Sequence, residues 1–216
     1  MNLDIKRYSH ILWDWNGTLL DDAWLCVEVM NRMLTERNLP PLTLQRYRDI
    51  FSFPVKDYYL LLGFDFKKEP FEKVGMDFMN LYNLRQRECT LHPEARGILL
   101  KIYGKGIPQS ILSAREENEL RTEIKESGIA SFFYKIYGLD DHYAHGKTDV
   151  GVKLIADLGL PVEKLLFIGD TLHDAEVSKE LKIDCILIPE GHHSMEKLSG
   201  SGFPVIASLK ELTGLL

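Results

Sequence analysis

The order of apolar segments along the chain constrains its fold more than any other feature. Helical patterns at Glu94–Tyr103, Glu116–Ser127 and Thr148–Leu158 are each followed by a glycine, as helix ends commonly are. They alternate with short, nearly continuous apolar runs that are typical of strands buried on both faces. These runs are Tyr8–Trp13, Ile107–Leu112, Phe132–Tyr137, Leu165–Ile168 and Cys185–Ile188, with a weaker one at Val205–Ala207. The alternation predicts an α/β fold with a doubly wound, Rossmann-like parallel sheet.

One interval breaks this alternation. From Asp22 to Arg87 the apolar spacing is helical, and no run has the character of a strand. The helical segments are Asp22–Arg37, one that Thr43 would cap, Pro54–Leu62 and Glu69–Arg87. Open α/β sheets bind ligands beyond the carboxyl ends of their strands. We therefore expect residues 21–88 to form an all-helical cap domain over that edge of a catalytic core, which residues 1–20 and 89–216 would build.

The composition narrows the class of protein. The 216 residues carry a formal net charge of −6, which argues against a nucleic-acid-binding protein because such proteins present a basic face. No segment approaches the ~18 consecutive apolar residues of a membrane span. Cys26, Cys89 and Cys185 are scattered and odd in number, which predicts buried thiols rather than disulfides or a zinc site. We expect a cytoplasmic enzyme of metabolism that is monomeric or weakly dimeric.

Acidic residues follow two of the predicted strands. Asp14 comes directly after the first strand, and Asp170 and Asp174 follow Leu165–Ile168. Like charges gathered from two strand ends need a cation to stay buried together. Hard oxygen ligands favour Mg²⁺, which is therefore the predicted cofactor. A surface loop with Asp170 as a helix cap would explain Asp170 and Asp174 but would leave Asp14 without a role.

Two further polar residues stand at the ends of predicted elements. Ser113 ends the strand Ile107–Leu112, and Lys147 precedes the helix Thr148–Leu158. A hydroxyl and an ammonium group suit the oxygens of a phosphoryl group. Each residue alone is more typical of a helix cap or a solvated surface lysine. Their order along the chain relative to the acidic residues is what points to a function.

The chain resembles the haloacid dehalogenase superfamily, whose four ordered motifs are matched by Asp14–Thr18, Ser113, Lys147 and Gly169–Asp174. The helical interval is similar to the C1-type cap of that superfamily, so the resemblance covers essentially the whole chain. Within the cap, Phe51–Pro54 and Asp57–Gly63 are similar to a segment of its phosphoglycolate-phosphatase-like members.

The resemblance implies a magnesium-dependent phosphohydrolase that acts on a small phosphorylated metabolite. Asp14 would attack phosphorus and form an aspartyl-phosphate, which water then hydrolyses. Mg²⁺ would be held by Asp14, the backbone carbonyl of Asn16 and Asp170, with Asp174 acting through a water. Ser113 and Lys147 would hold the phosphoryl oxygens. The substrate would also contact Thr18, Ala114, Arg115 and the cap residue Lys56.

Asn16 departs from the family pattern, in which phosphatases have a second Asp at this position. That carboxyl group protonates the leaving oxygen and later accepts a proton from water, which an amide cannot do. The expected loss is general acid–base catalysis, worth ~10²–10⁴ in rate. An engineered Asn16→Asp is therefore expected to raise turnover at least tenfold.

Three explanations of Asn16 stay open. The enzyme is slow or prefers good leaving groups, or it is a phosphate-binding protein that has lost turnover. In the third, the Asn16-Gly17 pair deamidates to Asp after synthesis.

Two other reactions fit the sequence less well. Dehalogenation uses the same nucleophile without a metal, so the Asp170 and Asp174 pair argues against it. Phosphonate hydrolysis would need a cap lysine for a Schiff base, and Lys56 is a poor candidate. His192 and His193 are expected to be exposed, because adjacent histidines in a loop without a third ligand form no metal site.

Overall fold

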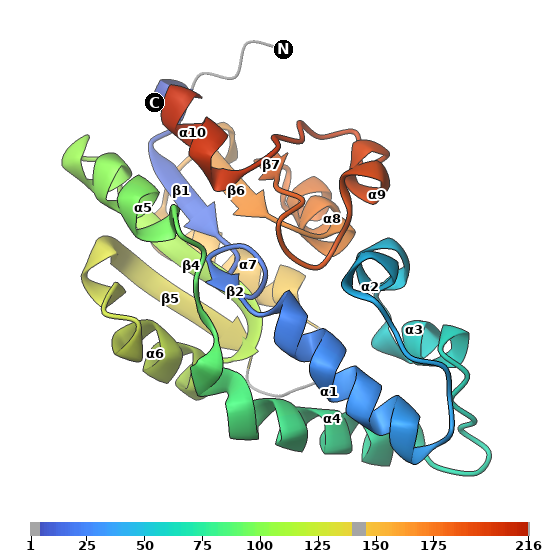
Figure 1. Ribbon diagram of the computed structural model, residues 1–216. Coiled ribbons are helices and arrows are strands. Elements are labelled where there is room, and N and C mark those ends of the chain that lie inside the picture. The colour runs from blue at the N-terminus through green and yellow to red at the C-terminus, as the bar shows by residue number, and fades with distance from the viewer. Residues whose placement is uncertain (1–4, 140–145, 216) are drawn as a thin grey trace.

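The centre of the molecule is a five-stranded parallel sheet with the order β5-β4-β1-β6-β7. The computed structural model describes residues 5–139 and 146–215. The strands are β1 (His10–Trp13), β4 (Gln109–Glu116), β5 (Phe133–Leu139), β6 (Leu165–Gly169) and β7 (Asp184–Leu187). β1 lies in the middle, with Trp13 opposite Ile111 on β4 and Ile168 on β6. The carboxyl ends of these three strands therefore meet at one edge, and the predicted α/β fold with a parallel sheet is confirmed (Figure 1).

Helices cover both faces of this sheet. Apolar side chains of α5 (Ala95–Gly104), α6 (Glu117–Glu126) and α10 (Leu209–Leu215) pack with Ile11 and Trp13 in one cluster. On the opposite face, α7 (Lys147–Leu158) and α8 (Leu172–Leu181) pack with Leu12 and Phe167. The alternation of Ile11, Leu12 and Trp13 between two clusters is the period-two pattern of a strand buried on both faces. The remaining short elements are α9 (Met195–Ser199) and the 3₁₀ helices η1 (Ile5–Arg7), η2 (Gln86–Glu88), η3 (Ala130–Phe132) and η4 (Val162–Lys164).

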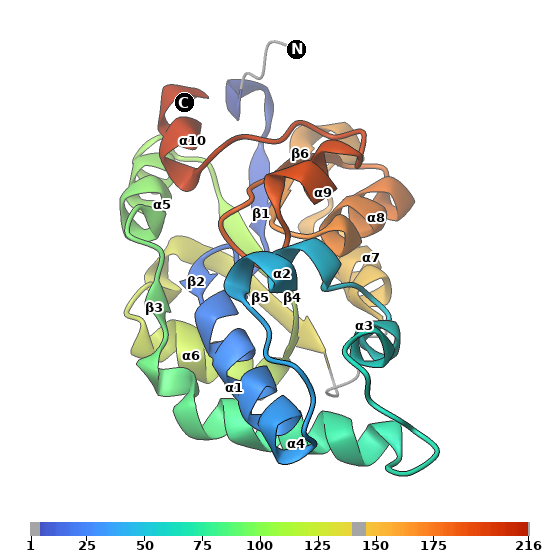
Figure 2. The same ribbon diagram turned by 45° about the vertical axis from the view of Figure 1, so that its right-hand side comes forward.

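Four helices lie between β1 and α5: α1 (Ala23–Glu36), α2 (Leu44–Ile50), α3 (Val55–Leu61) and α4 (Phe71–Arg85). A two-stranded antiparallel ribbon, β2 (Leu20–Asp21) with β3 (Thr90–Leu91), connects them to the sheet. The helices share an apolar cluster of their own that includes Leu25, Met30 and Tyr58. Figure 2 shows them grouped beyond one end of the sheet. We refer to 21–88 as the cap.

Several elements differ from the sequence-based expectation. The weak run Val205–Ala207 is not a sixth strand, because it pairs with β7 only at Val205. Pro204 lies beside this residue and has no N–H to extend a ladder. The ribbon β2–β3 was not predicted, since two residues are too few to show a period.

As predicted, the Thr43 hydroxyl caps α2 by accepting a hydrogen bond from the Arg46 amide. Within the described ranges, no helix is long and apolar enough to cross a bilayer.

A buried histidine at the start of β1 makes stability depend on pH. The His10 ring lies 2.8 Å from the Ser110 hydroxyl, and burial lowers the pKa of His10 to about 4. Below pH 6.5 the histidine protonates in the unfolded chain but not in the folded one, so stability falls as the pH falls. Between pH 7.5 and 5.5, wild type is expected to lose about 1 kcal/mol more unfolding free energy than His10→Gln, measured by urea denaturation. Equal losses in the two proteins would show that His10 is not buried in its neutral form.

Candidate active site

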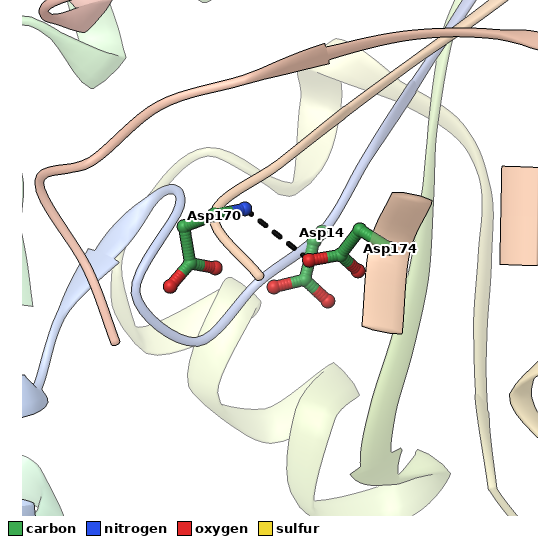
Figure 3. A group of neighbouring side chains, drawn as sticks. All are labelled: Asp14, Asp170 and Asp174. Carbon is green, nitrogen blue, oxygen red and sulfur yellow. Dashed lines mark hydrogen bonds between the residues drawn. The ribbon is translucent and has the colours of Figure 1, made fainter. Parts of the chain in front are cut away.

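Three buried carboxylates meet at the carboxyl edge of the sheet. Asp14 follows β1, Asp170 follows β6, and Asp174 lies in the first turn of α8. Each offers one oxygen, and these three oxygens all lie within 4.8 Å of one another. Figure 3 shows the three side chains pointing into a common space. Two strand ends and a helix start thus bring together residues that are far apart in the sequence.

Lys147 is the cation that faces this cluster. It is the first residue of α7, and its Nζ lies 2.5 Å from Asp14 Oδ1 and 2.6 Å from Asp174 Oδ1. Burial alone would lower the pKa of Lys147, but the charges of Asp14 and Asp174 raise it above its ordinary value. The ammonium group is therefore positive at neutral pH. It fixes the distance between the two carboxylates that it bridges.

Three carboxylates outnumber this single ammonium, and all three are buried, which is the largest influence on the pKa of each. Burial raises the pKa of Asp14, which Lys147 offsets only in part. Burial also raises the pKa of Asp170. Asp174 behaves differently: burial would raise its pKa, but the charge and hydrogen bond of Lys147 lower it. A divalent cation among the three groups would stabilise their ionised forms.

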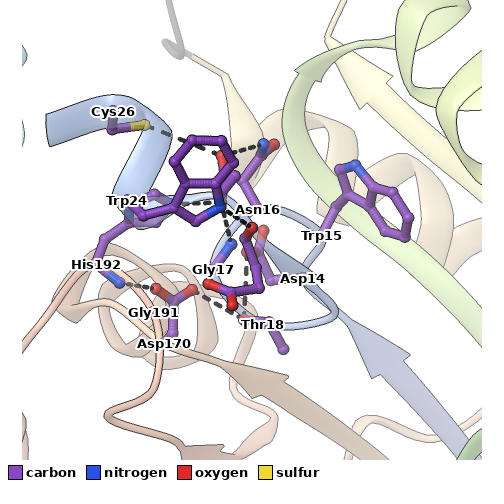
Figure 4. Close-up of polar contacts among 12 residues, drawn as sticks. Asp14, Trp15, Asn16, Gly17, Thr18, Trp24, Cys26, Asp170, Gly191 and His192 are labelled. Atoms are coloured by element: carbon purple, nitrogen blue, oxygen red, sulfur yellow. Dashed lines mark hydrogen bonds and ion pairs between the residues drawn. The ribbon is translucent and has the colours of Figure 1, made fainter. Parts of the chain in front are cut away.

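The Asp170 carboxylate is held by hydrogen bonds from two loops and lies close to their backbone. Its Oδ1 accepts a hydrogen bond from the Thr18 hydroxyl at 2.9 Å, and its Oδ2 accepts one from the His192 amide at 2.6 Å (Figure 4). A Cβ atom at Gly17 would lie 2.3 Å from Asp170 Oδ2, and one at Gly191 would lie 2.1 Å from it. Gly17 also has a φ of +75°, which residues other than glycine rarely adopt. Both glycines are thus required by the close approach of the carboxylate.

Asp174 combines a structural role with its place in the cluster. The helix cap is Thr171 rather than Asp170, and Asp174 completes the capping box of α8. Its Oδ2 accepts hydrogen bonds from the backbone amide and the hydroxyl of Thr171, at 2.9 and 2.7 Å. Its Oδ1 is left to face Lys147. One carboxylate therefore starts the helix and orients the lysine.

The Asn16 side chain is held by a carboxylate that the sequence analysis did not single out. Its Nδ2 donates to Asp22 Oδ2 at 2.9 Å, and it lies 3.1 Å from the Tyr82 hydroxyl. Asp22 Oδ2 also accepts from Tyr82 at 2.7 Å, and Oδ1 accepts from the Gly17 amide at 2.8 Å. This last bond ties down the backbone nitrogen that would attack the amide during deamidation. The arrangement therefore disfavours conversion of Asn16 to Asp.

Asp22 is further paired with His192, whose Nε2 lies 3.3 Å from Asp22 Oδ1. Burial would raise the pKa of Asp22, but the His192 charge and the hydrogen bonds from His192, Tyr82 and Asn16 hold it below its ordinary value. Asp22 is 1 % exposed, and both of its oxygens already accept hydrogen bonds. It is consequently an ionised acceptor and does not supply the proton that Asn16 lacks.

The prediction that His192 and His193 are exposed is wrong. They are 7 % and 2 % exposed, because the loop after β7 folds between the core and the cap. The His192 ring bonds the Tyr47 hydroxyl of α2 at 2.9 Å through Nδ1, and His193 Nδ1 accepts from the Leu172 amide at 3.0 Å. Sequence reasoning had no signal for this, since both partners lie on other elements. The pairing of Asp22 with Asn16 was missed because a single acidic residue at a helix start is common.

The other predicted residues lie at different depths. Ser113 is buried and Ala114 half-buried, and both line the cavity described below. The Arg115 guanidinium is 2.8 Å from Glu123 and 3.2 Å from Glu119, so it is already paired. Thr18 donates to Asp170 and is not among the residues that line the cavity. Lys56 lies on α3, exposed at the cavity edge, with Nζ 5.9 Å from the centre of the Phe71 ring.

A cavity of about 750 Å³ separates the carboxylate cluster from the cap. Asp14, Ser113 and Lys147 line its core side. Its cap side is formed largely by aromatic side chains of α2, α3 and α4 and of the segment between α2 and α3. A pocket of this size is typical of small-molecule sites. A carboxylate, a lysine and a hydroxyl thus share one cavity.

Residues 11–188 match the family described as haloacid dehalogenase-like hydrolase, and the chain belongs to that family. The predicted family membership and the expectation of a hydrolase are therefore confirmed. A relative in Pseudomonas aeruginosa, N-acetylmuramic acid 6-phosphate phosphatase, is 25 % identical over 181 residues, covering 81 % of this chain and 78 % of the relative. Phosphoglycolate phosphatase of Neisseria meningitidis is 24 % identical over 208 residues, covering 92 % and 88 %.

A solved structure shares the fold over almost the whole chain. It is a haloacid dehalogenase-like family hydrolase from Streptococcus pneumoniae, with a TM-score of 0.81 and 21 % identity. The match covers 98 % of this chain and 100 % of that one. The likeness thus includes the cap as well as the sheet.

Proposed function

We propose that this chain is a Mg²⁺-dependent phosphohydrolase that acts on a small phosphorylated metabolite through an aspartyl-phosphate at Asp14. One observation carries the proposal: the buried cluster of Asp14, Asp170 and Asp174 with Lys147 bridging two of its members. The relatives named as phosphatases match this chain over most of their length, which supports the same class of reaction.

The donor set fits a magnesium ion. Three carboxylates with oxygens within 4.8 Å of one another, and a single ammonium opposite them, leave negative charge that a divalent cation would balance. Asp14, Asp170 and the backbone carbonyl of Asn16 would hold the ion directly, and Asp174 would do so through a water. When bound, the ion would offset charge on the phosphoryl oxygens and bring them close to the nucleophile.

Asp14, Lys147 and Ser113 have separate roles in the proposed reaction. The Asp14 carboxylate attacks phosphorus, the bond to the leaving alkoxide breaks, and an aspartyl-phosphate forms. Lys147 and Ser113, which line the same cavity, hold the transferred phosphoryl oxygens. Lys147 is charged before substrate arrives, so no proton has to move to prepare it. Water then attacks phosphorus, which releases phosphate and restores Asp14.

Asn16 limits which leaving groups are handled well. Its amide is bound to Asp22 and cannot protonate an alkoxide. We therefore expect slow turnover of simple alkyl phosphates and faster turnover of acyl phosphates, whose leaving groups need no acid. Asn16 also favours a second candidate function, phosphate binding without turnover.

The test is phosphate release from acetyl phosphate by EDTA-treated protein with and without added Mg²⁺. Release that requires Mg²⁺ supports the phosphohydrolase. Binding of phosphate in the presence of Mg²⁺, with no release from any phosphorylated substrate, would support the second candidate instead.

Magnesium is also expected to stabilise the fold. At ten times its Kd, Mg²⁺ should raise the Tm by about 3–6 °C, because it binds the folded chain only. The matched variant is Asp170→Asn, which keeps the size of the side chain but removes one charge. Differential scanning fluorimetry should show a much smaller shift in that variant. An equal shift in both proteins would place the ion elsewhere.

A further inference from the structure

The cap side of the cavity contains a helical glycine that no packing contact requires. Gly75 lies in the second turn of α4 and lines the cavity, and a Cβ at this position would meet nothing within 4 Å. Its backbone φ is not in the left-handed region. A glycine in a helix interior destabilises the helix relative to alanine. The position therefore lowers helix stability and leaves open a space in the cavity that Asp14 also lines.

The walls around this space are aromatic and apolar. Phe71, Gly75, Phe78 and Tyr82 recur at helical spacing along α4, so they present one stripe to the cavity. On another side, the Phe53 ring of the cap stacks on the His173 ring of α8, with centroids 4.7 Å apart. Flat apolar walls of this kind contact ring-shaped groups well. The volume of about 750 Å³ is far more than a two-carbon leaving group would fill.

The charges around the cavity disfavour a second anionic group on the substrate. Lys147 and Arg115 are both paired with carboxylates, at 2.5–2.6 Å and 2.8–3.2 Å. His192 and Asp22 also line the cavity and are paired with each other at 3.3 Å. Three further acidic residues line the cavity: Glu72, Glu116 and Glu176. Lys56 is the remaining lysine of the lining, and it is exposed at the edge. A carboxylate on the leaving group would thus face more negative than positive charge.

We propose that the substrate is a phosphomonoester of an uncharged, ring-bearing alcohol whose ring lies against α4 beside Gly75. This inference rests on the proposed function and assigns the leaving group that the same site accepts. It predicts that a side chain added at Gly75 blocks the ring but spares the phosphate site.

The test compares phosphate esters that all leave as primary alcohols, so that the leaving chemistry is matched. Benzyl phosphate and glucose 6-phosphate carry an uncharged ring, ethyl phosphate carries none, and 2-phosphoglycolate carries a carboxylate. We expect kcat/KM for at least one ring-bearing ester to exceed those of ethyl phosphate and phosphoglycolate by at least about tenfold. Acetyl phosphate reports on the phosphate site alone.

The variants are Gly75→Leu and the matched control Gly75→Ala. Gly75→Leu should lower kcat/KM for the preferred ring ester at least about tenfold, leave acetyl phosphate within about twofold, and raise the Tm because leucine favours helix. Gly75→Ala should raise the Tm with a much smaller effect on the ring ester. These outcomes together support the proposal.

Other outcomes overturn it. Phosphoglycolate as the best ester, with its turnover lost in Lys56→Met, would show that the cap binds a carboxylate. An equal effect of Gly75→Leu on all substrates, or none on the ring esters, would show that no ring lies at α4. Failure of acetyl phosphate to react at all would instead overturn the phosphohydrolase, so the two failures are distinguishable.

Discussion

Replacing Asp14 with asparagine is expected to reduce Mg²⁺-dependent phosphate release by at least about 10³-fold, because the amide cannot form the covalent intermediate. The fold should survive the change. Asp14 is one of three buried carboxylates around one lysine, so its neutral amide relieves repulsion while keeping the volume. Phosphate release and the Tm, measured on the same preparations, separate the two effects.

The matched control is Asp21→Asn, the same chemical change in β2 at a residue that does not line the cavity. It should keep turnover within about twofold. If Asp14→Asn retained a tenth of the wild-type rate, another group would be the nucleophile.

Introducing a carboxylate at position 16 is expected to give its largest gain in turnover only when Asp22 is replaced as well. In Asn16→Asp alone, the new carboxylate would take the place of an amide that lies 2.9 Å from Asp22 Oδ2. Two buried carboxylates in contact cannot both ionise. We expect this variant to lose about 3 kcal/mol of unfolding free energy at pH 8, and to recover it as the pH falls and the pair takes up a proton.

The double variant Asn16→Asp with Asp22→Asn exchanges the amide and the carboxylate. Its total charge equals that of wild type, and the amide at 22 can donate to the carboxylate at 16. Turnover of an alkyl phosphate should rise about 10–100-fold over wild type, within the range that general acid–base catalysis supplies. Asp22→Asn alone should show no gain. Equal stability and equal turnover of the single and double variants would mean that Asp22 does not constrain position 16.

The sequence was sufficient for the parts of the site that follow from strand order. Asp14 follows β1 and Asp170 follows β6, and in a parallel sheet such ends meet at one edge. Ser113 does not end its strand as predicted, because β4 continues to Glu116, but it lies at the same edge, two residues beyond the last pair of β4 with β1. Lys147 could be added because a helix start lies at the same edge. Each of these positions follows from where a strand or helix lies, and the spacing of apolar residues predicts those elements.

Residues whose positions depend on loops and on the cap could not be predicted. His192 lies in the loop after β7, and its ring is fixed by Asp22 and by Tyr47 of α2. Arg115 follows Ser113 closely, as a phosphate ligand would, but Glu123 of α6 holds its side chain. The missing information in both cases is the pairing of side chains across elements. The spacing of apolar residues along the sequence does not indicate which side chains pair across elements.

The central claim is that Asp14 becomes esterified, and chemical trapping tests it most directly. Protein turning over acetyl phosphate with Mg²⁺ is quenched in acid and reduced with borohydride, which converts an aspartyl-phosphate to homoserine. Peptide mass spectrometry should find homoserine at position 14 only when both acetyl phosphate and Mg²⁺ were present. Continued Mg²⁺-dependent phosphate release with unmodified aspartate at position 14, or with homoserine at another position, would contradict the account.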